Sequence, residues 1–108
     1  MNGIHLRLYT YENRRIHGEL SYEWLLEKAR GLGIHGGSAF RAIAGFGRHG
    51  RIHEQSFFEL AGEVPVLVEF LLDEEQCGHL LALLKDEDMP LFYTRTPVTF
   101  GVVGNADA

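Results

Sequence analysis

Apolar and polar residues alternate along the first extended segment of the chain, residues 4–11. One face carries Ile4, Leu6, Leu8 and Thr10, and the other carries His5, Arg7, Tyr9 and Tyr11. A period of two predicts a β-strand with one face on a core. Residues 64–72 are apolar almost throughout, which is typical of a central strand or of one covered by a second subunit, with Pro65 at its start.

Two segments show helical spacing instead. After Ser21, which we expect to cap the helix, apolar residues recur at Tyr22, Leu25, Leu26, Ala29 and Leu32, and Gly31 and Gly33 can end it. In the second segment Asp73 and Gln76 form a capping-box pair. An apolar stripe follows at Cys77, Leu80, Leu81 and Leu84. Acidic residues 86–88 are unfavourable at a helix C-terminus, so this helix should end near Lys85.

The remaining extended segments complete an alternating order. One begins at Ser38, and the last covers residues 91–93 and 98–103 with an interruption at Thr96-Pro97. Strand, helix, strand, strand, helix, strand predicts an α+β fold, a ferredoxin-like βαββαβ sandwich with two helices on one face of a four-stranded antiparallel sheet. The other sheet face then exposes much apolar surface, which oligomerisation would cover.

Composition narrows the class of protein. The chain has 108 residues, enough for one domain with a real core, and its formal charge of −5 argues against a nucleic-acid binder. A lone cysteine, Cys77, suits a reducing compartment and is most simply a small core residue. Without a signal peptide or a membrane-spanning run, we expect a cytoplasmic single-domain protein, 1–108, with a flexible tail at 103–108.

Positive charge is concentrated in residues 40–53, where closely spaced glycines break a strand. The glycines have two interpretations: they bend the chain out of the sheet, or their amides help the neighbouring arginines hold an anion. Arg41 also has a structural interpretation, an ion pair with an acid such as Glu69. Arg95 is a second basic residue suited to a subunit cleft. The candidate ligand-binding residues are Arg41, Gly45, Gly47, Arg48, Arg51 and Arg95.

Metal binding and catalysis have less support in the sequence. His49 and His53 have the spacing of helical metal ligands, but Gly50 disfavours a helix and no cysteine joins them. No serine or cysteine is accompanied by an evident base, and no pair of carboxylates marks a cleft, so we expect no enzymatic activity.

The glycine-rich stretch also carries a family resemblance. Residues 36–47, together with Ile52-His53 and residues 64–69, resemble the PII-like proteins of the PII and CutA superfamily. The resemblance covers about residues 4–103 and implies a cytoplasmic, homotrimeric signalling protein. It implies a small anionic ligand, with an adenine nucleotide as the candidate, in the clefts between subunits.

In true PII signalling proteins the loop after the second strand contacts target proteins. The resemblance therefore implies contact through residues 48–62, with a membrane transporter or channel as a candidate partner. The chain departs from PII proteins at residues 86–90, which are acidic and lack the glycines and lysine that cradle phosphates there. This difference argues against ATP binding in the PII manner. A CutA-like metal-binding or stress protein and a structural interaction module are the alternative functions.

Overall fold

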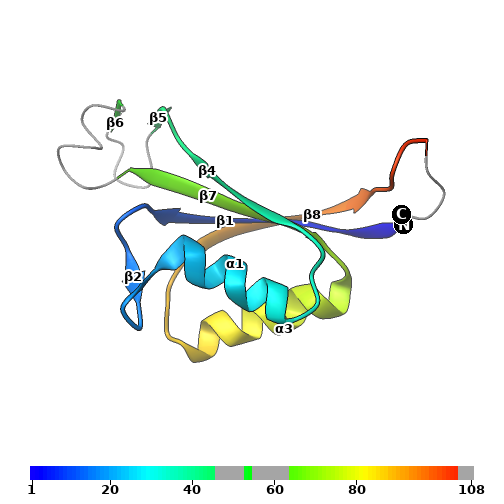
Figure 1. Ribbon diagram of the computed structural model, residues 1–108, viewed down its shortest axis with the longest axis horizontal. Helices are drawn as coiled ribbons and strands as arrows, with labels where there is room; N and C mark the ends of the chain where they lie inside the picture. Colours follow the sequence, from blue (N-terminus) through cyan, green and yellow to red (C-terminus); the bar gives the residue numbers. More distant parts are fainter. Residues whose placement is uncertain (46–52, 55–63, 105–108) are drawn as a thin grey trace.

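The computed structural model describes residues 1–45, 53–54 and 64–104. Two helices cover one face of a four-stranded sheet (Figure 1). The sheet contains β1 (Asn2–Tyr11), β4 (Gly37–Arg41), β7 (Pro65–Leu72) and β8 (Phe92–Thr99) in the order β4-β7-β1-β8, with every neighbouring pair antiparallel. This order and the helix placement confirm the predicted ferredoxin-like fold.

The two central strands show the burial that their sequences predict. In β1 the set Ile4, Leu6, Leu8 and Thr10 is buried, and in β7 Val66, Val68, Phe70 and Leu72 are buried. The register sets Leu6 opposite Phe70 and Leu8 opposite Val68, so these side chains share the face that the helices cover. β7 lies between β4 and β1, as predicted for a central strand, but in the single chain only alternate residues are buried and Leu71 is exposed on the other face.

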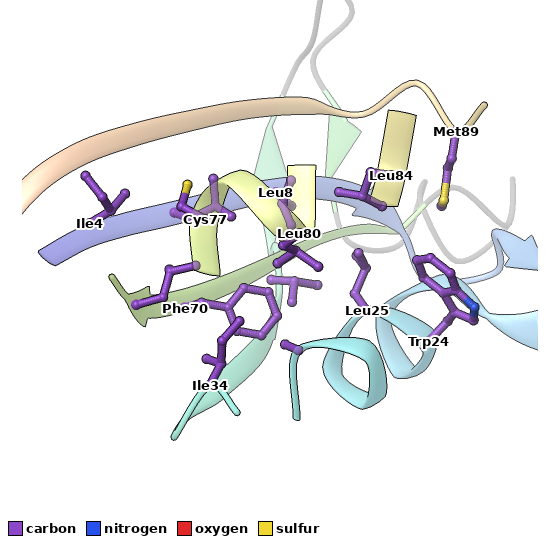
Figure 2. Packing of buried hydrophobic residues seen from close by; sticks show 14 of the residues in the cluster. Ile4, Leu8, Trp24, Leu25, Ile34, Phe70, Cys77, Leu80, Leu84 and Met89 are labelled. Carbon is purple, nitrogen blue, oxygen red and sulfur yellow. The ribbon is translucent and has the colours of Figure 1, made fainter. Parts of the chain in front are cut away.

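The helices complete the core, whose packing Figure 2 shows. α1 (Ser21–Gly31) contributes Trp24, Leu25 and Ala29, and α3 (Glu74–Asp86) contributes Cys77, Leu80 and Leu84. Asp73 and Gln76 form the predicted capping box: the Gln76 amide donates to Asp73 Oδ1 over 2.7 Å, and the Asp73 amide donates to Gln76 Oε1 over 3.0 Å. α3 ends at Asp86, within one residue of the end predicted near Lys85.

Two predictions about these elements are wrong. Ser21 does not cap α1: Leu20 is the cap residue, and the buried Ser21 hydroxyl is hydrogen-bonded to Thr10 Oγ1 over 2.8 Å. The last strand is not interrupted at Pro97, because among the described strands β8 pairs only with β1, and a proline is tolerated on an edge strand.

The face of the sheet opposite the helices, the helix-free face, is lined by every second residue of the four strands. It exposes large apolar side chains, with 41% of Tyr9 and 66% of Phe92 accessible. Tyr11, Phe40 and Leu71 are exposed beside them. The chain alone therefore leaves uncovered the apolar surface that the sequence predicted.

Candidate functional site

The positively charged stretch leaves the sheet at the end of β4. The Ala42 amide donates to the Pro65 carbonyl over 2.9 Å, and the chain then forms β5 (Ala44–Gly45). β5 pairs antiparallel with β6 (His53–Glu54), with Gly45 opposite His53. The candidates Gly47, Arg48, His49 and Arg51, and most of segment 48–62, lie outside the described residues.

Gly45 has free space around it among the described residues. A Cβ atom added to Gly45 would meet no heavy atom of the described residues within 4 Å outside its immediate chain neighbours, and its backbone is not left-handed. These residues therefore leave room for a side chain at this position.

Arg41 ends β4 and forms an ion pair with Glu12, not with Glu69 as predicted. The reason is the alternation of the strands. Arg41 is in register with Val66, on the side of the helices, whereas Glu69 points to the helix-free face and accepts a hydrogen bond from His5 Nε2 over 2.8 Å. About half of the Arg41 side chain, 52%, remains exposed. Arg41 thus keeps an accessible cationic surface beside β5.

Arg95 lies on the opposite edge strand, β8, in register with Leu6 and therefore also on the side of the helices. Its guanidinium donates to Glu74 in the first turn of α3 over 2.5 Å. This hydrogen bond raises the pKa of Arg95 above its ordinary value, so the side chain stays cationic.

One chain does not bring the two arginines together. β4 and β8 are separated by β7 and β1, and the register places Arg41 level with Thr10 but Arg95 level with Leu6. With strands about 4.8 Å apart and about 3.3 Å per residue along a strand, the two Cα atoms are roughly 20 Å apart. In the single chain the two guanidinium groups are therefore held apart, Arg41 by Glu12 and Arg95 by Glu74.

A basic hairpin between β1 and α1 is a further feature of this side of the molecule. β2 (Arg15–Ile16) and β3 (Glu19–Leu20) pair across a turn in which His17 and Gly18 have positive φ. His17 Nε2 donates to Glu87 over 2.5 Å, and Arg14 donates to the Pro90 carbonyl over 3.2 Å. The hairpin therefore binds the acidic turn 86–90. Nothing in the sequence signalled these contacts, which join residues at least seventy positions apart.

An open groove of about 330 Å³ lies apart from these residues, between the C-terminal end of α1 and the start of β4. Its lining includes Leu26, Arg30, His35 and Phe70, and none of the predicted site residues. Within the described ranges, no three histidine, cysteine, aspartate or glutamate side chains are grouped so that they could hold a metal ion. The described helices include none with the length and apolar character needed to cross a membrane.

Solved structures agree with this architecture. A structure of CPII, a nitrogen regulatory PII-like protein from Thiomonas intermedia K12 bound to ADP, AMP and bicarbonate, superposes with a TM-score of 0.67 at 19% identity, covering 94% of this chain and 91% of that one. The fold is thus PII-like, which confirms the resemblance seen in the sequence.

Two relatives are similar in sequence. A UPF0166 protein of Aquifex aeolicus is 38% identical over 74% of this chain and 76% of its own length. A UPF0166 protein of Methanocaldococcus jannaschii is 30% identical over 73% of this chain and 72% of its own length. The family DUF190, described as "Uncharacterized ACR", matches residues 3–99, and the chain belongs to this family.

Proposed function

We propose that the chain is the subunit of a homotrimeric, non-enzymatic PII-like regulatory protein in the cytoplasm. It binds a small anionic ligand in the clefts between subunits and contacts a partner protein through segment 48–62. Binding of the ligand controls the contact with the partner, for which a membrane transporter or channel is our candidate.

The position of the two described arginines carries this proposal. Arg41 and Arg95 lie on opposite edges of the sheet, both on the side of the helices and both partly exposed. When the β4 edge of one copy approaches the β8 edge of the next, the two guanidinium groups converge on one cleft. Two guanidinium groups suit a phosphate or a carboxylate, which they can bind in a bidentate manner.

The helix-free face supports assembly of the same copies. Phe92 and Tyr9 lie with ring centroids 5.5 Å apart and remain accessible on this face. Burial of apolar surface is the main driving force for association, so packing of these faces around a common axis would stabilise an oligomer. In the same assembly the sheet edges of neighbouring copies come next to each other.

The ligand that we favour is an adenine nucleotide, alone or with a second small anion. This choice rests on the ADP, AMP and bicarbonate bound by CPII, whose fold this chain shares. The turn 86–90 is a poor site for phosphates because it is acidic and its Glu87 and Pro90 already bind the hairpin. We therefore assign the phosphate contacts to Arg41, Gly45, Gly47, Arg48 and Arg51 of one copy and to Arg95 of the next.

Ligand-dependent thermal unfolding tests this function. ADP, AMP, ATP and bicarbonate are added singly and in pairs to the purified protein at fixed protein concentration. A ligand present at about 100 times its Kd stabilises the folded state by about 2.7 kcal/mol, which raises the Tm by several degrees. Arg41→Met and Arg95→Met should each abolish most of this increase.

Arg30→Met is the matched control, since Arg30 is an exposed arginine on α1 whose ion pair is with Glu27 in the same helix. It should leave the ligand-induced increase unchanged. If no nucleotide or bicarbonate raises the Tm of the wild-type protein, the ligand proposal is wrong for these compounds. An increase with Zn²⁺ or Cu²⁺ that His53→Gln removes would favour the CutA-like alternative, and an unliganded trimer would favour an interaction module.

A further inference from the structure

The centre of the helix-free face is polar, although its surroundings are apolar. His5 and Arg7 of β1, Glu69 of β7 and Thr94 of β8 occupy this centre, because the register sets Arg7 opposite both Glu69 and Thr94. All four residues are half-buried even in the single chain. Covering this face with another copy of the chain would remove them from water.

The polar groups at this centre are incompletely paired. Glu69 Oε2 accepts the hydrogen bond from His5 Nε2, which leaves the other carboxylate oxygen without a donor among the described residues. Arg7 forms neither an ion pair nor a hydrogen bond with any described side chain, although Glu69 is its cross-strand neighbour. On the other side of Arg7, Thr94 Oγ1 is buried and has no hydrogen-bond partner in the described part of the chain.

Such groups are costly to leave unpaired once water is excluded. A buried guanidinium requires a carboxylate, and a buried hydroxyl requires a donor or an acceptor. Each face offers one unpaired guanidinium and one carboxylate oxygen, so the charges of neighbouring faces are complementary. One guanidinium and one carboxylate per face balance each other when a second copy of the chain covers the face. An added anion would instead leave Glu69 buried beside a second negative charge.

From this arrangement we infer that Arg7 of one copy forms an ion pair with Glu69 of the neighbouring copy at the centre of the assembled helix-free faces. The inference rests on the assembly proposed above and assigns the polar contact that specifies it. The guanidinium donates to the open Glu69 oxygen, and its remaining N–H groups lie over Thr94 Oγ1, which accepts. His5 stays on Oε2 and holds the carboxylate in place.

The consequence is a defined orientation of the subunits. Apolar packing of Tyr9, Phe92 and Leu71 is tolerant of rotation, whereas a guanidinium and a carboxylate at the centre of the interface fit in one register only. The same register determines how the β4 and β8 edges meet, and therefore the shape of the ligand cleft.

A double-mutant cycle in the full chain tests the inference, with the oligomeric state measured by sedimentation velocity over a range of protein concentrations. Arg7→Met and Glu69→Gln should each shift the midpoint of assembly to at least about 30-fold higher protein concentration, because each leaves one charged or polar group buried without its partner. The double variant should assemble better than the sum of the single effects predicts. Arg30→Met, at an exposed arginine of α1 and not on the helix-free face, should assemble like the wild type.

A further variant separates this inference from the proposed assembly. Phe92→Asp places a charge on the apolar part of the same face and should dissociate the oligomer whatever the role of Arg7. If Phe92→Asp dissociates the oligomer but Arg7→Met and Glu69→Gln do not, the ion pair is refuted and the assembly stands. If Phe92→Asp has no effect, the helix-free face is not the interface and both proposals are wrong. Additive effects of Arg7→Met and Glu69→Gln, or assembly that requires added phosphate or chloride, would also refute the ion pair.

Discussion

Gly37 should be the glycine of the 36–37 pair whose replacement damages the fold. A Cβ atom at Gly37 would lie 2.4 Å from Phe70 Cε1 and 2.5 Å from Phe70 Cδ1, and 3.2 Å from Leu26 Cδ2. Phe70 is only 3% exposed and packs in the core, so its ring cannot simply move into solvent. At Gly36 the added Cβ atom would meet no heavy atom within 4 Å.

The expected magnitude follows from this difference in contacts. Forcing an extra methyl group into a packed core costs about 1–3 kcal/mol, because side chains leave their preferred rotamers. For a domain of this size that loss lowers the Tm by about 5–20 °C. Gly36→Ala restricts the unfolded chain without a clash in the folded state, so it should be neutral or stabilise by up to about 1 kcal/mol.

Urea unfolding, followed by circular dichroism and by the fluorescence of the buried Trp24, measures both variants at one protein concentration. Phe70→Leu in the Gly37→Ala background should recover part of the loss, since leucine lacks the ring edge that the new methyl group meets. The reasoning is refuted if Gly37→Ala and Gly36→Ala have the same free energy of unfolding, or if Phe70→Leu adds its full cost to that of Gly37→Ala.

Three further predictions concern the capping box, a buried hydrogen bond and the buried thiol. Asp73→Ala should lower the free energy of unfolding by about 1 kcal/mol, because it removes the side-chain acceptor at the start of α3. Asp86→Ala, at the C-terminal end of α3, should not lower the free energy of unfolding measured in urea titrations. Thr10→Val should cost about 1–3 kcal/mol by the same measurement, since it leaves the buried Ser21 hydroxyl unpaired, and a loss below about 0.5 kcal/mol would contradict this pairing. Burial raises the pKa of the Cys77 thiol, partly opposed by Arg95, so iodoacetamide should label Cys77 slowly in the native protein and rapidly in denaturant. Because the pKa of the thiol is raised in the folded protein, the neutral thiol contributes fully to the free energy of unfolding at a pH below the ordinary thiol pKa. This contribution should be lost as the pH rises through the raised pKa. Rapid labelling of the native protein would contradict the burial of Cys77.

The sequence predicted the central strands and α3 well because local signals there agree with tertiary packing. Alternation in β1 follows from burial of one strand face against the helices. In β7 the same burial accounts for alternate residues, and the apolar residues between them face the helix-free side. The capping box of α3 is a local interaction, so residues 73–76 are sufficient to identify it.

The failures occurred where a distant contact decides the outcome. Ser21 is a good cap residue in isolation, but its hydroxyl is engaged by Thr10 across the core. Arg41 was assigned to Glu69 by charge alone, whereas the register places the two on opposite faces of the sheet. Pro97 suggested an interruption because the sequence does not reveal that β8 is an edge strand.

The candidate site was predictable in kind but not in arrangement. Arg41 and Arg95 were named as candidates from charge and context, and the structure places them on opposite edges of the sheet, an arrangement that the sequence did not indicate. The contacts of the hairpin with turn 86–90 required the fold, because Arg14 and Pro90 are 76 residues apart.

Native mass spectrometry of the freshly purified protein tests the central claim, an oligomer with ligand sites between its subunits, most directly. The account predicts a homotrimer that retains or takes up a nucleotide or another small anion, with ligand bound to the trimer and absent from dissociated subunits. A monomer that binds the ligand by itself, or a monomer at all accessible concentrations, would contradict the account.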